Sequence, residues 1–216
     1  MRSTLPSYFK FYADISGIPN TVNKKTGDIQ DVVLAMTSVS KRSIKPLLFD
    51  IEKRYPRYWN RKGHQLESKE LEIIVNYLNK NDILMFTINF DKKDWAKYRK
   101  LYPNETDLGP KVMGILYYFI LKYFAKKKFM YEAVCCHDTM FDVHQSIVLC
   151  KRLLRKIDMD FDITVGYRDI NPELRLPDWI AQARRKIPIE NLERYDNFYI
   201  LKNRLYKKYR DFLFKS

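Results

Sequence analysis

YFKFYADISG (Tyr8–Gly17) alternates apolar and aromatic residues with a lysine until it reaches Asp14, and Ser16–Gly17 then break the run. Such alternation is typical of a β-strand, and the small residues predict a turn at its end. A sheet would hold this carboxylate still and leave it open to a ligand. Taken alone, Asp14 is equally explained as a residue that caps the turn.

The charge of the chain indicates what kind of partner it has. Its 216 residues include 40 Lys+Arg and 26 Asp+Glu, which gives a formal net charge of +14. This excess favours a phosphate backbone or another anionic surface, because an enzyme for small metabolites has no need of it. The alternative is a lysine- and arginine-rich surface of the thermophile type. The hydrophobic fraction of 46% is enough for the core of one domain.

Cysteine usage and hydropathy favour a reduced, cytoplasmic protein. Cys135, Cys136 and Cys150 follow neither a zinc-binding spacing nor a disulfide framework. The N-terminal residues lack the apolar run of a signal peptide. Val112–Ala125 is too short to span a bilayer and carries Lys122, so it predicts a buried helix. We therefore expect no membrane segment.

Strand-like and helix-like segments alternate along the chain. Strands are expected at residues 8–17, 31–40, 82–90, 129–136 and 161–167, and the first two are expected to form a hairpin. Helices are expected at 44–55, 67–78, 110–126, 142–157, 176–186 and 191–216. This order predicts an α/β domain with a mixed sheet of about five strands flanked by helices.

The expected organisation is one α/β domain over residues 1–189 and a basic, aromatic C-terminal helix over residues 190–216, packed on the domain or extending from it. Phe198, Leu201, Leu205 and Phe212 are spaced to line one side of that helix. Its basic residues would clamp a nucleic acid or a partner, or would simply form a solvated face.

Residues 55–63 predict a basic and aromatic loop. It contains Arg57, Trp59, Arg61 and Lys62, which would hold a nucleic-acid strand by charge and stacking. A surface loop with one anchored tryptophan explains the same residues.

Two more acids fall at the ends of expected elements. Asp138 follows the strand at 129–136, and Asp178 begins the helix after the last strand. Together with Asp14 they would converge on one edge of the sheet, where a cation must offset their repulsion. Oxygen ligands suit Mg²⁺ or Mn²⁺, which would act on a phosphodiester. Separately, Asp138 is explained as a helix N-cap and Asp178 as a favourable first-turn acid.

Three stretches resemble motifs of the domain-of-unknown-function-3800 family, a branch of the ribonuclease H-like superfamily. YADISG (12–17) resembles its strand-one D-E-S-G motif, and YEAVCCHDTMF (131–141) resembles its middle strand, which ends in an aspartate. LRLPDWIAQARRK (174–186) resembles its L-Q-x-A-D-x-x-A-G-x-x-R helix, with Asp178 on the aspartate, Ala181 on the alanine, and Arg184 or Arg185 at the basic end.

The resemblance implies a ribonuclease H-like sheet and a metal-dependent nuclease site with Asp14, Asp138 and Asp178 as ligands. Two positions depart from the pattern: Ile15 stands where the family has a glutamate, and the family's central E-L-K patch falls near Gln65. Glu67 would replace that acid, or Glu70 one turn further on.

Three hypotheses follow. The first is a nuclease that uses Mg²⁺ or Mn²⁺ to hydrolyse DNA or RNA, with phosphate contacts from Arg184, Arg185 and the loop at residues 55–63. The second is a nucleic-acid-binding protein on the same fold without catalysis, which Ile15 favours. The third is a structural or interaction module with an incidentally basic surface.

Overall fold

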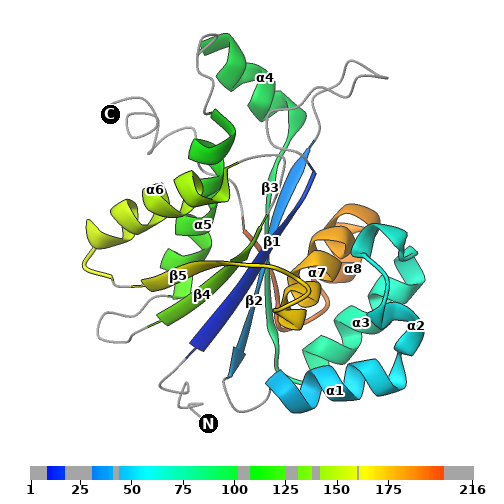
Figure 1. Ribbon diagram of the computed structural model, residues 1–216. Coiled ribbons are helices and arrows are strands. Elements are labelled where there is room, and N and C mark those ends of the chain that lie inside the picture. Colours follow the sequence, from blue (N-terminus) through cyan, green and yellow to red (C-terminus); the bar gives the residue numbers. More distant parts are fainter. Residues whose placement is uncertain are drawn as a thin grey trace.

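A six-stranded mixed sheet forms the centre of the computed structural model (Figure 1). The structure describes residues 9–17, 31–40, 44–101, 108–124, 131–137, 142–159 and 161–201. In spatial order the strands are β5 (Phe161–Gly166), β4 (Tyr131–Cys136), β1 (Phe9–Ser16), β2 (Val32–Ser40), β3 (Leu84–Phe90) and β6 (Phe198–Leu201). β2 pairs antiparallel with β1 and β3, and the other neighbours pair parallel. The predicted α/β class and mixed sheet are confirmed, with six strands in place of five.

Helices cover both faces of the sheet (Figure 1). On one face lie α5 and α6, together with Trp95 of α4. The other face is covered by α1, α3 and α7 and by the short helices α2 and α8. The helix bounds are α1 Ile44–Arg54, α2 Pro56–Trp59, α3 Ser68–Lys80, α4 Lys92–Leu101, α5 Leu108–Phe124, α6 Val143–Arg155, α7 Arg175–Lys186 and α8 Ile189–Leu192. Two 3-10 turns complete the described elements, η1 at Gly63–Gln65 and η2 at Pro172–Leu174.

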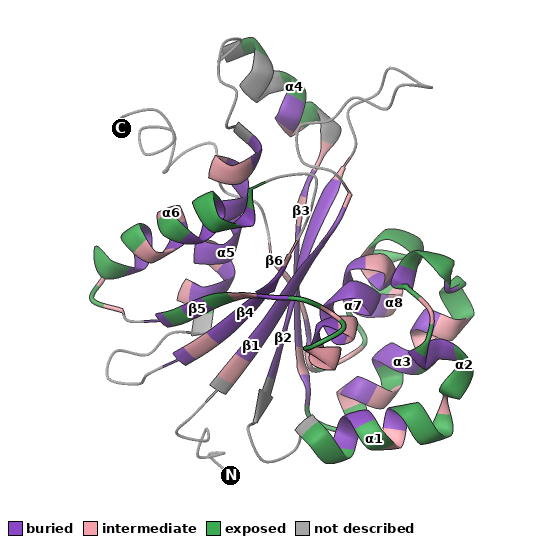
Figure 2. Ribbon diagram, viewed as in Figure 1, coloured by how far each residue is buried: buried purple, intermediate pink, exposed green. Residues whose placement is uncertain are grey.

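Side chains of β1 alternate between the two cores. Phe11, Ala13 and Ile15 are buried in the core that α5 and α6 cover, whereas Tyr12 is buried in the core that α7 covers. Because successive side chains of a strand point to opposite faces, Asp14 and Ser16 share the α7 face with Tyr12. Figure 2 shows β1 buried along most of its length, so Asp14 lies in the interior.

The C-terminal segment corrects the predicted helix over 191–216. Residues 198–201 form β6, which pairs parallel with the outer edge of β3. Phe198 and Ile200 pack into the core on the α7 face, whereas Tyr199 and Leu201 pack into the core on the other face. This alternation shows that Phe198 and Leu201 satisfy a strand pattern, although their spacing also fits a helix. Residues 202–216 lie outside the described part of the chain.

The hydrophobic helix α5 is buried, as predicted, and packs against α6. Gly114 lets the two helices approach, because a Cβ at this position would lie 2.6 Å from the carbonyl oxygen of Ser146 and 3.1 Å from the Cβ of Leu149. Among the helices in the described ranges, none has the length and apolar character that a membrane span requires.

We predict that Gly114→Ala destabilises the protein. Alanine in place of glycine favours a helix by about 1 kcal/mol, but the clash with the Ser146 backbone forces α5 and α6 apart, and overpacking costs about 1–3 kcal/mol. Urea unfolding measures the change. Asn76→Ala, on the exposed side of α3, is the control that gains helix propensity without a clash. A Gly114→Ala variant more stable than the wild type would contradict the close packing.

Candidate functional site

Asp14 and Asp178 meet at the carboxyl end of β1, where one arginine binds both carboxylates. Arg168 donates from Nη2 to Oδ2 of Asp14, and its Nη1 lies 3.5 Å from Oδ2 of Asp178. The two aspartates are only 5% and 6% exposed. Buried carboxylates are costly unless they are paired, so Arg168 supplies the positive charge that this arrangement requires.

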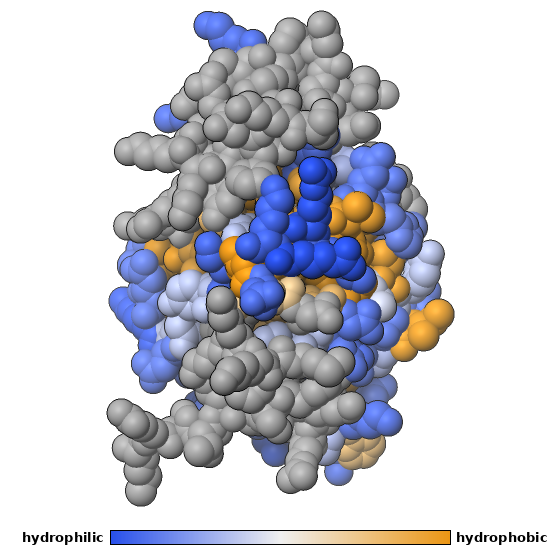
Figure 3. All heavy atoms as spheres, turned by 90° about the vertical axis from the view of Figure 1, so that its left-hand side faces the viewer, coloured by the Kyte–Doolittle hydropathy of each residue, from blue (hydrophilic) through white to orange (hydrophobic). Residues whose placement is uncertain are grey.

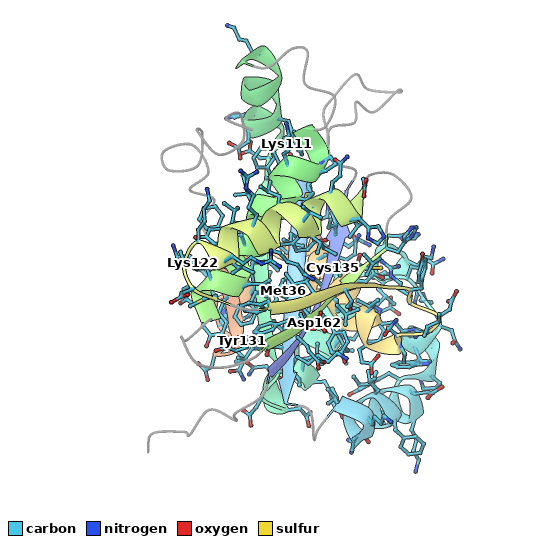
Figure 4. The ribbon with its side chains drawn as sticks, turned by 60° about the vertical axis from the view of Figure 1, so that its left-hand side comes forward. Met36, Lys111, Lys122, Tyr131, Cys135 and Asp162 are labelled. Carbon is cyan, nitrogen blue, oxygen red and sulfur yellow. The ribbon has the colours of Figure 1, made fainter. Side chains whose placement is uncertain are left out.

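Three elements bring these side chains together. β1 ends two residues after Asp14, Arg168 lies in the turn that follows β5, and Asp178 stands in the first turn of α7. Figure 4 labels Tyr131 and Cys135, which lie near the beginning and the end of β4. Because β1, β4 and β5 run parallel, all three strands end at the same edge of the sheet, where the site is built.

The electrostatics of Asp14 are dominated by its burial. The pKa of Asp14 is raised from its ordinary value of 3.8 to about 7, chiefly by burial and in smaller part by the neighbouring charge of Asp178. The Arg168 guanidinium and the backbone N–H of Ile15, which donates to Oδ1 of Asp14 at 2.8 Å, oppose this rise in pKa. For Arg168, burial lowers the pKa, but the two carboxylates together raise it above its ordinary value. The arginine therefore stays charged, and Asp14 holds its proton up to about neutral pH.

A second contact fixes α7 against the end of β1. The hydroxyl of Ser16 accepts hydrogen bonds from Nε2 of Gln182 at 2.6 Å and from Nη1 of Arg185 at 3.0 Å. Asp178, Gln182 and Arg185 are four and then three residues apart, so they share one face of the helix. Gly17 follows with a φ of +95°, and a Cβ there would lie 2.3 Å from the carbonyl oxygen of Asp31.

Gly63 lies directly against Asp178 and Gln182 of α7. Its backbone N–H donates to Oδ2 of Asp178 at 2.8 Å. A Cβ at this position would lie 2.8 Å from the carbonyl oxygen of Asp178 and from Cγ of Gln182, so only glycine fits without a shift. The segment before α3 therefore lies directly against the helix that carries the second acid.

The structure brings together only part of the predicted acid set. Asp14 and Asp178 converge as expected, whereas Asp138 lies outside the described residues. Glu67 lies elsewhere: the hydroxyl of its neighbour Ser68 donates to the Lys186 carbonyl at the far end of α7. That end is about 12 Å along the helix from Asp178. Glu67 donates its backbone N–H to the Glu70 carboxylate at 2.8 Å, so both residues organise the beginning of α3.

The loop predicted at residues 55–63 is partly helical in the structure, because Pro56–Trp59 form α2 and Gly63 begins η1. Trp59 is 9% exposed, with the Arg175 guanidinium 4.7 Å from its ring centre and Trp179 against its edge, so its position does not fit stacking on a base. Arg61 pairs with Glu70 at 2.8 Å and also donates to the Gln65 carbonyl. The structure thus favours the anchored tryptophan over the nucleic-acid strand. Arg57 and Lys62 are exposed.

The two arginines at the end of α7 differ in their surroundings. Arg185 is exposed and contacts Ser16, two residues from Asp14. Arg184 is half-buried, which lowers its pKa, and its Nε is buried without a hydrogen-bond partner in the described structure. Of the basic residues predicted to contact phosphate, Arg185 is therefore the one that borders the acid pair.

Ile15, where the family pattern has a glutamate, does not weaken the pair. Its side chain packs in the core on the α5 face, opposite to Asp14. An acid at position 15 would therefore not join Asp14 and Asp178. The three cysteines are buried, and burial raises the pKa of the Cys135 and Cys136 thiols to about 12, so neither is a thiolate nucleophile at neutral pH.

Sequence reasoning missed Arg168 and Gly63. Arg168 follows directly on the last predicted strand, at the same edge of the sheet as the acids, and a search for the counter-ion of a buried acid cluster would have found it. No pattern around Gly63 indicates its contact with α7, because the approach is set by tertiary packing.

The donor chemistry of the pair fits one divalent cation. Asp14 and Asp178 offer carboxylate oxygens, the ligands that Mg²⁺ and Mn²⁺ prefer. The described ranges contain no group of three or more acid, histidine or cysteine side chains arranged to hold a metal ion. Comparison of the chain with protein-family models and with curated proteins finds no match.

We predict that the pair makes stability depend on pH in an unusual direction. An acid with a raised pKa in the folded state keeps its proton while the unfolded chain loses it, so stability falls as pH rises from about 4 to 7 and is then constant. The loss is on the order of a few kcal/mol, because each pKa unit is worth about 1.4 kcal/mol.

Urea unfolding of the wild type and of Asp14→Asn across this range isolates the effect of Asp14. The free energy of unfolding of the wild type, minus that of Asp14→Asn, should decrease with rising pH. An increase would mean that attraction to Arg168 outweighs burial, and it would contradict the raised pKa.

Proposed function

We propose that this chain is a ribonuclease H-like, divalent-metal-dependent nuclease whose metal ligands include Asp14 and Asp178. The observation that carries the proposal is the convergence of these two acids, far apart in sequence, at the carboxyl edge of a mixed sheet. Two buried carboxylates held close together repel each other. Such an unfavourable arrangement is typical of functional sites, here one that binds a cation.

The order of the strands supports a ribonuclease H-like sheet. The series β3-β2-β1-β4-β5 begins with an antiparallel meander and continues with parallel strands, and within the described sheet only β2 runs against the others. In this proposal β6 is an addition on the outer edge of β3. The high positive charge of the chain further supports a nucleic acid, either DNA or RNA, as the substrate.

Each residue at the edge has a distinct role in the proposed nuclease. Asp14 and Asp178 would hold one Mg²⁺ or Mn²⁺. When bound, the ion would supply Lewis acidity and neutralise the charge on the phosphodiester. Arg168 keeps the two carboxylates in place without the ion, and Gly63 orients Asp178 through its N–H. Arg185 borders the pair and would bind a backbone phosphate.

We predict Mn²⁺-dependent cleavage of a labelled nucleic acid that is lost in Asp14→Asn and in Asp178→Asn. Each variant removes one carboxylate ligand from the pair, and removal of one electrostatic group from an active site lowers rates by about 10²–10³-fold. The assay compares single-stranded and duplex DNA and RNA with Mn²⁺, with Mg²⁺ and with EDTA.

Glu52→Gln is the matched control, because Glu52 is an exposed acid on α1, outside the acid pair. Asp138→Asn, assayed alongside, tests the third predicted ligand. Residual cleavage that is equal in the wild type and in the Asp14 and Asp178 variants would sink the proposal.

The second candidate is a nucleic-acid-binding protein without catalysis, and two observations favour it. Arg168 already neutralises the acid pair. In addition, basic residues gather at the end of α6, which precedes β5 and so lies at the opposite edge of the sheet. Arg152, Arg155 and Lys156 are exposed there. Figure 3 faces this side of the molecule, where hydrophilic side chains cross the centre of the surface.

A cavity of about 220 Å³ lies beside this basic group. Lys151 and Arg155 of α6 line it together with Tyr131, Phe161 and Asp162 of β4 and β5. Figure 4 labels Tyr131 and Asp162 at this end of their strands. A phosphate backbone that runs over α6 would meet this basic and aromatic hollow far from Asp14.

For this candidate we predict binding that persists in Asp14→Asn and weakens steeply with salt. On duplex DNA each phosphate contact contributes about 0.9 to the slope of log K against log salt concentration. Arg152→Gln with Arg155→Gln should therefore lower that slope by about 1–2 in a fluorescence-anisotropy titration. Absence of binding at low salt would leave the protein as an interaction module.

A further inference from the structure

A pair of stacked rings stands at the edge of the sheet next to Arg168. The His137 and Tyr167 rings lie 4.7 Å apart with 25° between their planes. The two residues continue the β4–β5 register, in which Cys136 pairs with Gly166, and the His137 N–H donates to the Gly166 carbonyl at 2.8 Å. The rings are therefore neighbours across two strand ends, held by the backbone of the sheet.

This ring pair is open to solvent. Tyr167 is 52% exposed, His137 is partly buried, and Ile170 in the same turn is 78% exposed. A stacked neighbour covers one face of a ring, so the exposed area of Tyr167 lies on its other face and its edge. Large apolar side chains exposed together beside a buried charged cluster are typical of a binding surface.

The turn that carries Tyr167 is fixed by its own hydrogen bonds. The Tyr167 carbonyl accepts from the N–H of Ile170 at 3.1 Å, from the N–H of Asn171 at 2.7 Å and from Nδ2 of Asn171 at 3.2 Å. Gly166 makes room for this arrangement, since a Cβ there would lie 3.0 Å from Nδ2 of Asn171. The ring is thus presented by a rigid turn, and little conformational entropy is lost when a ligand binds to it.

We propose that His137 and Tyr167 form a stacking platform for an unpaired base, so that the preferred ligand is single-stranded nucleic acid. The inference rests on the proposed action on nucleic acid and names the substrate form. Tyr167 is the residue before Arg168, so the platform stands at the same edge of the sheet as the acid pair. Bases stack on exposed aromatic rings without regard to sequence, whereas a base inside a duplex already stacks on its neighbours.

The test measures binding without cleavage. The full-length protein is titrated in EDTA with a single-stranded oligonucleotide that carries one 2-aminopurine, and with the same strand in a duplex. Stacking on an aromatic side chain is worth about 1–3 kcal/mol per base, so Tyr167→Ala should raise the Kd for the single strand about 5- to 150-fold. Tyr167→Phe keeps the ring and should keep both the affinity and the quenching of 2-aminopurine.

Phe49→Ala is the matched control, because it removes an exposed aromatic ring from α1. It should bind both probes as the wild type does, and Tyr167→Ala should bind the duplex as the wild type does. Equal affinity of Tyr167→Ala and the wild type for the single strand overturns the platform, and so does an equal loss for both probes.

These results are separable from the nuclease assay. Stacking without Mn²⁺-dependent cleavage supports the platform and sinks the nuclease. Cleavage that depends on Asp14, together with single-strand binding that does not depend on Tyr167, supports the nuclease and overturns the platform.

Discussion

The pairing of Arg168 with two buried aspartates is the constraint on which the arrangement of this edge depends. Asp14 and Asp178 are almost inaccessible to water, and they lie close enough for each to disfavour the charge of the other. Arg168, in the turn after β5, contacts both carboxylates and opposes their repulsion. Because the two carboxylates repel each other, their arrangement is sensitive to protonation, to a bound metal ion and to the position of Arg168.

The alternation of β1 decides which side of the sheet carries the chemistry. Odd-numbered residues from Phe11 to Ile15 fill the core beneath α5 and α6, and even-numbered residues face α7. A difference at position 15 therefore changes the core, whereas a difference at position 14 or 16 changes the site. This separation explains why an apolar residue at position 15 does not disturb Asp14.

Much of the fold could be predicted from the sequence because its signals are local. The sequence itself contains period-two strands, apolar helix stripes and acids at the ends of three elements. These signals predicted β1 to β5, α7 and the convergence of Asp14 with Asp178. The failures have tertiary causes. β6 forms because β3 offers an unpaired edge, and Trp59 is buried because Arg175 and Trp179 cover it. Arg168 was missed because it lies in a turn, where only the need of two buried acids for a counter-ion points to it.

The contacts of the candidate site join segments that are distant along the chain. Arg168 and Asp14 are separated by 154 residues, and Gly63 and Asp178 by 115. Pairings of this range close long loops, and the packing of the rest of the fold must offset the loop-closure entropy that they cost. A fragment that stops before α7 would keep Asp14 at the end of a strand but would lose Asp178, Gln182 and Arg185. The acidic edge therefore depends on the whole topology. It is complete only when the turn after β5 and α7 are both packed against the end of β1.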